Sequence, residues 1–183
     1  MNLNGNNTTE NKPFEILLDK TVISKRITVL GKEISDDYKN RNPIIIGVLK
    51  GCFVFMSDLI RAINIPVEIE FVSASSYKEG EKQSKKIDFV SAVPIPLKNR
   101  DIIIVEGVVD SGRTAETILK ELRKMEPASI EFVTLIDKPG SHQVKLDLKY
   151  KGFTIGNEFI IGFGLDNTQK YRNLPFIGKL IDN

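Results

Sequence analysis

Cysteine and histidine are almost absent from this chain of 183 residues, which has one of each. A single cysteine excludes an internal disulfide bond, so a reducing compartment, the cytoplasm, is expected. Zinc sites built from cysteine and histidine need more of these ligands than the chain contains. Cys52 is followed by Phe53, Val54 and Phe55, and we expect it to be a buried small side chain rather than a catalytic thiol.

Long apolar runs and a strong excess of one charge are also missing. No run approaches the ~20 apolar residues that cross a bilayer, so no membrane partner is expected. The polar stretch 1–12 lacks the apolar core of a secretion signal. We expect a disordered tail there and a single domain over residues 13–183. A net charge of +2 does not suggest a broad nucleic-acid-binding face, and no nucleic-acid partner is expected.

Buried strands alternate with amphipathic helices along the chain. Apolar residues three or four apart predict helices from Asp19, the expected N-cap, to Tyr38, over 53–63, and from Arg113 to Met125. Apolar and β-branched runs predict strands at 44–49, 67–71, 101–106, 129–137 and 159–166, with the proline-containing segment 87–97 at an edge. This order predicts an α/β fold in which a mainly parallel twisted sheet is flanked by helices.

The stretch IIIVEGVVDSGRT, from Ile102 to Thr114, joins a buried strand to two acids and a turn suited to an anion. Ligands of a parallel sheet bind at the carboxyl ends of its strands, where residues 110–114 are expected. Backbone N–H groups at a helix start, two hydroxyls and a glycine suit one phosphate group. Neither the Walker A pattern nor G-x-G-x-x-G occurs, which disfavours triphosphate hydrolysis. The alternative is that Asp110 or Ser111 only caps the helix.

Glu106 is harder to explain by local structure. A carboxylate at the end of a buried strand needs a hydroxyl, a cation or a metal ion as a partner. Sugar hydroxyls lying between the acids and a phosphate would explain why carboxylates are found beside an anion-binding turn. The motif therefore predicts a site for a phosphorylated sugar.

This motif resembles the phosphoribosyl pyrophosphate signature of the type I phosphoribosyltransferases, in which apolar residues and acids precede D-[ST]-G-[RK]-T. Four further segments are similar to the hypoxanthine-guanine branch of that family: VLKGCFVFMSDL (48–59), Ser76-Tyr77 before a polar loop, LIDKP (135–139) and FIIGFGLDNTQKYRNLP (159–175). The resemblance covers the chain from about Arg26 to Leu180. It implies the family's fold with a small hood subdomain. It also implies purine salvage, in which phosphoribosyl pyrophosphate and hypoxanthine or guanine give IMP or GMP and pyrophosphate.

The resemblance assigns roles at the phosphoribosyl end of the site. The 5′-phosphate would be held by Asp110, Ser111, Gly112, Arg113 and Thr114, and the ribose hydroxyls by Glu106. Asp110 would also be the catalytic residue that accepts a proton near the purine N7. Pyrophosphate would bind to Lys50, Gly51 and Arg172, with a cis peptide bond before Lys50. The implied cofactor is Mg²⁺, near Glu106 and Asp166, which stabilises the leaving pyrophosphate.

At the purine end, Lys138 would donate to the 6-oxo group and Phe159 would stack on the base. The backbone at Ile160 and Asp166 would contact the guanine amino edge. Ser76, Tyr77 and the loop after them would form a flap that excludes water. Without the resemblance, the sequence would favour a loop lysine for Lys138, a core aromatic for Phe159 and a surface arginine for Arg172.

Gly107 departs from the family pattern, which usually has a second acid after Glu106. That carboxylate normally helps to hold the ribose. We therefore expect its loss to weaken binding of phosphoribosyl pyrophosphate, and Gly107→Asp to restore it. The alternative is that glycine lets another chain segment approach closely.

A second interpretation is a non-catalytic regulator that senses phosphoribosyl pyrophosphate or nucleotides. Such regulators often carry a DNA-binding extension, for which the tail 1–12 is too short, and Lys138, Phe159 and the flap favour a working base site. An RNA-binding relative would need a basic face, which the net charge of +2 does not indicate. The expected partners are the two small-molecule substrates and further copies of the chain, as a homodimer or homotetramer.

Overall fold

The main sheet has six strands in the order β4-β3-β2-β5-β6-β7. The computed structural model describes residues 14–76, 87–89 and 95–181. The strands are β2 (Ile44–Leu49), β3 (Glu68–Ser76), β4 (Ile87–Phe89), β5 (Asp101–Val109), β6 (Ser129–Asp137) and β7 (Tyr150–Thr154). All neighbours are parallel except β4, which pairs antiparallel with β3 at the edge. The predicted mainly parallel sheet is confirmed, as is the edge position of its Ile87–Phe89 segment.

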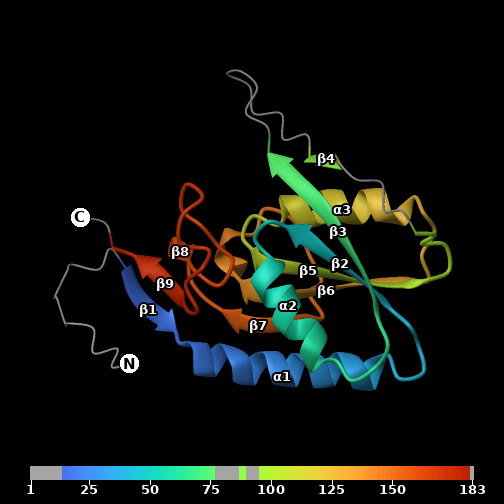
Figure 1. The fold of residues 1–183 in the computed structure, drawn as a ribbon. Coiled ribbons are helices and arrows are strands. Elements are labelled where there is room, and N and C mark those ends of the chain that lie inside the picture. The colour runs from blue at the N-terminus through green and yellow to red at the C-terminus, as the bar shows by residue number, and fades with distance from the viewer. Residues whose placement is uncertain (1–13, 77–86, 90–94, 182–183) are drawn as a thin grey trace, which may run out of the picture.

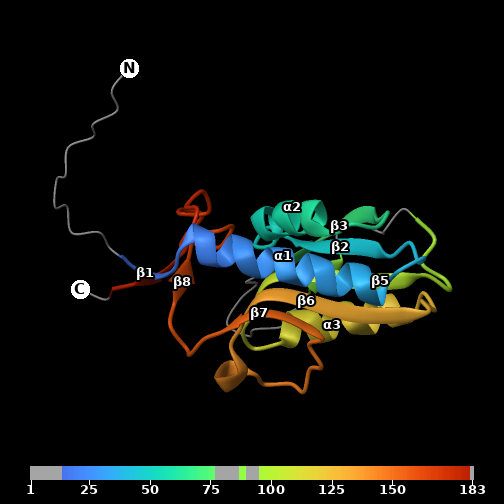
Figure 2. The ribbon, with the colours of Figure 1, turned by 90° about the horizontal axis from the view of Figure 1, so that it is seen from below.

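Helices cover both faces of this sheet (Figures 1 and 2). On one face, α1 (Lys20–Asp37) and α2 (Phe53–Ala62) pack against alternate strand residues such as Ile103 and Val105. On the other face, α3 (Arg113–Arg123) packs against Ile102 and Ile104. Successive strand residues face opposite sides, so a strand that is covered on both sides is apolar throughout.

The first helix begins as its sequence predicts. Asp19 accepts hydrogen bonds from the backbone N–H groups of Thr21 at 2.7 Å and Val22 at 2.9 Å, which satisfies two donors that a helix start leaves free. The predicted apolar positions of the helix, Ile23, Ile27, Leu30 and Ile34, are all buried. No helix among residues 14–76, 87–89 and 95–181 is both long and apolar enough to cross a membrane.

A small antiparallel sheet, in the order β1-β9-β8, lies at one end of the molecule and forms the hood (Figure 1). Its strands are β1 (Phe14–Leu18), β8 (Ile160–Ile161) and β9 (Ile177–Leu180). The prediction of one buried strand over 159–166 was wrong. The chain turns after Ile161, and Gly162 and Gly164 take φ values of +92° and +97°. Phe163 and Leu165 are buried because they pack against the α1–α2 side of the core.

Cys52 is fully buried, as expected, at the start of α2. Burial, followed by the nearby charge of Glu106, raises the pKa of its thiol to about 12. At neutral pH the thiol therefore stays protonated and is a poor nucleophile. The tail 1–12 and the polar loop 77–86, for which disorder and mobility were expected, lie outside the described residues.

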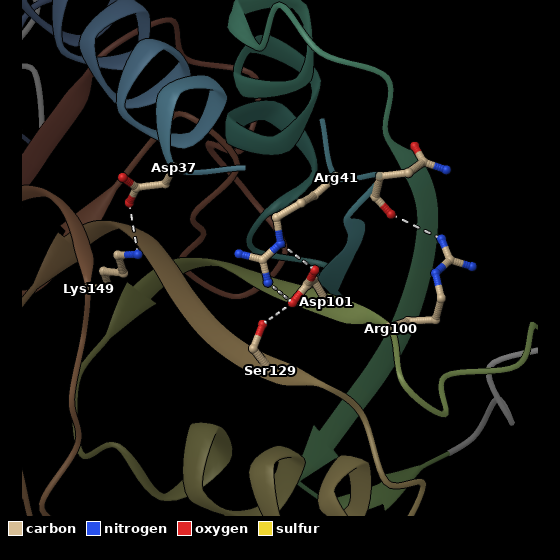
Figure 3. A network of polar contacts seen from close by, with 7 residues as sticks. Asp37, Arg41, Arg100, Asp101, Ser129 and Lys149 are labelled. Carbon is tan, nitrogen blue, oxygen red and sulfur yellow. Dashed lines mark hydrogen bonds and ion pairs between the residues drawn. The ribbon is translucent and has the colours of Figure 1, made fainter. Parts of the chain in front are cut away.

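A polar network ties together the amino ends of the central strands, opposite the edge where ligands are expected (Figure 3). Asp101 accepts hydrogen bonds from Arg41 Nε at 2.7 Å and from Ser129 Oγ at 2.6 Å. These contacts join the segment before β2, the start of β5 and the start of β6. Nearby, the Asp37 carboxylate pairs with Lys149 Nζ at 2.8 Å.

We expect Asp101→Asn to lower the free energy of unfolding by about 1.5–3 kcal/mol at neutral pH, the range for hydrogen bonds to a charged group. Burial raises the pKa of Asp101, but hydrogen bonds from Ser129 and Arg41 and the charges of Arg41 and Arg100 outweigh it and hold the pKa below its usual value. A carboxyl group whose pKa is lowered by folding stabilises the fold at pH values above its pKa in the unfolded chain, ~4. This stabilisation disappears as the pH falls through the folded value.

Urea unfolding of both proteins between pH 7 and pH 2 tests this expectation, and the difference in stability should shrink toward the acid end. Asp36→Asn is a matched control, because Asp36 forms an exposed i,i+4 pair with Lys32 and should change stability by less than about 0.5 kcal/mol. A difference for Asp101→Asn that is independent of pH would contradict the expectation.

Candidate active site

The turn between β5 and α3 leaves backbone donors free for an anion. Gly112 is the N-cap of α3, with φ +78°. Asp110 makes no hydrogen bond to the start of the helix in the described structure, so the alternative that Asp110 is the cap is wrong. Ser111 precedes the N-cap, and its Oγ accepts one long hydrogen bond, 3.5 Å, from the Arg113 N–H. N–H groups of the first helical turn remain available to a phosphate group.

Lys138 and Asp110 leave the sheet side by side, because β5 and β6 pair Val109 with Asp137. Lys138 is only 5% exposed, so it is buried rather than an ordinary loop lysine, the role that the sequence alone favoured. Its Nζ donates to the Glu158 carbonyl at 2.8 Å and lies 3.4 Å from Asp110 Oδ2. A buried donor and a carboxylate thus face the same space.

Phe159 follows the carbonyl that holds Lys138, and it is 56% exposed. A core role for this aromatic ring is therefore wrong. An exposed ring beside a buried donor offers a flat apolar surface for a planar ligand. Ile160, the next residue, lies in β8, and its side chain is buried in the core.

Glu106 is buried at the carboxyl-terminal part of β5, and its Oε1 has no hydrogen-bond partner among the described residues. Burial raises the pKa of this carboxyl group to about 8, since no partner offsets the loss of water. A buried acid without a partner is costly in a folded protein. A ligand hydroxyl or cation would supply what Glu106 lacks.

The Lys50–Gly51 turn lies close to the segment 162–174. The Leu49–Lys50 peptide bond is cis, as the resemblance implied, and Lys50 is exposed. A Cβ atom on Gly164 would lie only 2.7 Å from the Gly51 carbonyl oxygen, so the two segments are in contact.

Arg172 is no ordinary surface arginine, because only 19% of its side chain is exposed. Nη1 donates to the Gly164 carbonyl at 2.8 Å, and Nη2 lies 2.7 Å from Asp166 Oδ1. The other Asp166 oxygen accepts from the Gln169 N–H at 2.7 Å. Arg172 and Asp166 thus hold each other in place on one loop.

Comparison with known proteins identifies the family of this fold and site. The family described as phosphoribosyl transferase domain matches residues 14–168. The chain belongs to the phosphoribosyltransferase family. The resemblance found in the sequence motifs is therefore confirmed at the level of the family and its fold.

Similar proteins include hypoxanthine and hypoxanthine-guanine phosphoribosyltransferases. The hypoxanthine-guanine phosphoribosyltransferase of Lactococcus lactis is 40% identical over 91% of this chain and 90% of its own length. The Escherichia coli hypoxanthine phosphoribosyltransferase is 36% identical over 91% and 95%. Bifunctional TilS/HprT proteins of Listeria also match at 35%, but this chain spans only 28% of their length.

Solved phosphoribosyltransferase structures agree with the fold. The Staphylococcus aureus hypoxanthine phosphoribosyltransferase has a TM-score of 0.89 at 34% identity, covering 97% of each chain. A mutant of the Trypanosoma cruzi hypoxanthine phosphoribosyltransferase, described as a ternary substrates complex, has a TM-score of 0.85 at 34% identity. It covers 91% of this chain and 94% of that one.

Sequence reasoning missed the backbone partners of the site, such as the Glu158 carbonyl and the Gln169 N–H. Every residue carries such groups, so the sequence held no signal for them. For the expected flap, Ser76 is the last residue of β3 and pairs with Ile87 of β4. Tyr77 lies outside the described residues.

Gly107 allows a close approach of chain segments, which favours that alternative over a merely lost contact. A Cβ atom at position 107 would lie 2.6 Å from the Gly51 carbonyl oxygen and 3.1 Å from Leu165 Cδ2. A distance of 2.6 Å to a backbone oxygen cannot be kept, so the turn would have to move. Gly107 and Gly164 therefore enclose the Gly51 carbonyl from two sides.

We expect Gly107→Asp to weaken binding of phosphoribosyl pyrophosphate by roughly tenfold or more, instead of tightening it. Overpacking costs about 1–3 kcal/mol, and each kcal/mol lowers the melting temperature of a chain of this size by about 2–4 °C. Calorimetric titration and thermal unfolding measure the two effects.

Gly107→Ala is the matched control, since it adds the same Cβ atom without a charge. It should reproduce most of both losses. Tighter binding by the aspartate variant, with an unchanged melting temperature, would restore the lost-contact explanation.

The candidate site fits a Mg²⁺ ion that the substrate helps to hold. Among the described residues there is no group of three or more His, Cys, Asp or Glu side chains that could bind a metal ion alone. Mg²⁺ is commonly held by one or two carboxylates together with substrate phosphates and water. Glu106, with its unpartnered buried oxygen, suits such a contact, whereas Asp166 already pairs with Arg172.

Proposed function

We propose that this phosphoribosyltransferase transfers the 5-phosphoribosyl group of phosphoribosyl pyrophosphate to hypoxanthine or guanine in purine salvage. The reaction class follows from its family. The choice of base rests on the 3.4 Å approach of Lys138 Nζ to Asp110 Oδ2. The O6 acceptor and the N7 position of a 6-oxopurine are neighbours on one edge of the base. A buried donor beside a proton acceptor matches that edge.

In the proposed reaction, purine N9 bonds to ribose C1′ while the bond between C1′ and pyrophosphate breaks. Positive charge develops on the ribose and negative charge on the leaving group, so the site must stabilise both. Asp110 takes the proton from N7 as the new bond forms. Lys50, Gly51 and Arg172 bind pyrophosphate. When bound, Mg²⁺ acts as a Lewis acid that neutralises the charge of the leaving group.

The remaining predicted contacts position the two substrates. Turn residues Ser111, Gly112, Arg113 and Thr114 bind the 5′-phosphate at the start of α3. The ribose hydroxyls supply the partners that Glu106 lacks. The Phe159 ring stacks on the base, and the backbone at Ile160 and Asp166 contacts the 2-position. Ser76 and Tyr77 belong to a flap that excludes water during transfer.

A turnover assay with phosphoribosyl pyrophosphate, Mg²⁺ and each purine base tests the proposal. Release of pyrophosphate with formation of IMP or GMP is expected. Binding of phosphoribosyl pyrophosphate without turnover of any base would instead support the regulator. That alternative is disfavoured because Lys138 is buried at the purine end of the site, and a protein that senses only phosphoribosyl pyrophosphate would not need a donor for a base.

We further infer a single domain over 13–183, a cytoplasmic location, and a homodimer or homotetramer as the working state. The lone cysteine supports the location, because a reducing compartment needs no disulfide bonds. Closed symmetric assemblies are the usual form of soluble oligomers. The proposed partners are the two small-molecule substrates, without a nucleic acid or a membrane.

A further inference from the structure

The only histidine of the chain, His142, faces a buried acid next to the candidate purine site. Its Nε2 lies 2.9 Å from Asp137 Oδ1, and the two side chains are 18% and 4% exposed. The distance is that of an ion pair, but the ring N–H is not aligned for a hydrogen bond. Neither atom has another partner in the described structure. Two buried polar atoms that have no other partner depend on their contact with each other.

The segment that carries His142 joins the purine end of the site to the phosphate end. Asp137 ends β6 and directly precedes Lys138, whose N–H donates to the Val109 carbonyl at 3.0 Å. The short 3₁₀ helix Pro139–Ser141 follows. One residue after His142, the Gln143 N–H donates to the Ser111 carbonyl at 3.0 Å.

The same segment also packs against the phosphate turn. A Cβ atom on Gly112 would lie 2.8 Å from Val144 Cγ2 and 2.7 Å from Leu146 Cδ1. A shift of residues 142–146 would therefore be transmitted to the N-terminus of α3. His142 lies between two parts of the site that must keep a fixed separation.

Among the described residues, one other side chain forms an ion pair with Asp137: Lys151 on β7, whose Nζ lies 3.8 Å from Asp137 Oδ2. Lys151 is about half exposed, so it is a weak partner for a buried carboxylate. Lys138 directs its amine to Glu158 and Asp110 instead. His142 is therefore the nearest side-chain partner of the buried Asp137 carboxylate.

We propose that His142 is a positioning residue, which holds Asp137 and so keeps Lys138 and the phosphate turn in register for the purine and the phosphoribosyl group. This rests on the proposed function, in which Lys138 contacts the base. Loss of the contact between His142 and Asp137 therefore raises the KM for hypoxanthine. The value of kcat changes less, because His142 touches no reacting atom.

The test compares the hypoxanthine KM and kcat of the native protein with those of two variants at one pH. His142→Arg keeps a cationic partner for Asp137 and should have a KM close to that of the native protein. His142→Gln is neutral and should have a KM about tenfold higher, equivalent to one charge-assisted hydrogen bond, with a smaller change in kcat.

Ser141→Ala is the control for general loosening of the segment. It removes the 2.9 Å contact with Asn157 and should leave the hypoxanthine KM unchanged. A His142→Gln variant with the same hypoxanthine KM as the native protein would overturn the proposal.

Hydrogen exchange of the Gln143 amide separates this proposal from the function on which it rests. The amide should exchange faster in His142→Gln than in His142→Arg, whether or not any purine is turned over. Equal exchange in both variants would overturn the positioning role. Absence of turnover in the native protein, with unequal exchange, would overturn the proposed function alone.

Discussion

Hypoxanthine is expected to be converted with a kcat/KM about 10⁴-fold higher than adenine, the scale of discrimination that a buried polar group can produce. Lys138 is the reason. Its ammonium group has three donors and no acceptor, so it pairs with a 6-oxo group and opposes a 6-amino group. The amine is buried and anchored to the Glu158 carbonyl, so it cannot turn away to water when adenine enters.

Steady-state kinetics with both bases measure the ratio, and Lys138→Gln is the informative variant. A glutamine amide can donate or accept, so the preference should fall steeply while some turnover of each base remains. Phe159→Leu is the control, because loss of stacking should affect both bases alike. Adenine turnover within tenfold of hypoxanthine in the native protein would refute the role of Lys138.

Asp110→Asn is expected to lower kcat by about 10²–10⁴-fold, the usual loss when a general base is removed. The amide has nearly the same shape as the carboxylate but cannot take the purine proton. The KM values should change much less, since the phosphate turn keeps its backbone donors. Because Gly112 rather than Asp110 is the N-cap of α3, the melting temperature should stay within a few degrees.

Single-turnover kinetics show whether the slowed step is the chemical one. Asp36→Asn, at an exposed position on α1, is the control for removing one carboxylate charge and should keep the native kcat. An unchanged chemical rate in Asp110→Asn would remove Asp110 from the reaction. A fall in melting temperature that corresponds to ~1 kcal/mol, the stability lost with a helix cap, would indicate a structural role for Asp110 instead.

The hydrophobic pattern predicted the central elements because the buried residues of each recur at the period of its own helix or strand. Ile102 to Val105 alternate between the two core faces, and Ile23 to Ile34 lie on one side of α1. The pattern failed where segments distant in the chain bury apolar residues outside helices and strands. Phe163 and Leu165 are apolar, as in a buried strand, yet they lie in a turn that packs against the helices.

The strands of the hood were missed for a related reason. Phe14–Leu18 and Ile177–Leu180 are short, and they pair with each other across nearly the whole chain length. Tyr150–Thr154 joins the sheet only through its partner β6. Strands of four or five residues are stabilised by distant partners, which local sequence does not specify.

The sequence by itself determined the family, the α/β order of the central elements and the residue types of the candidate site, because motifs and periodicity are local properties of the chain. Only the tertiary structure decided how those residues meet. It placed Lys138 beside Asp110 through the register of β5 and β6, and it paired Arg172 with Asp166. It also favoured the close-approach alternative at Gly107, since the space available at a residue depends on segments that are distant in the chain.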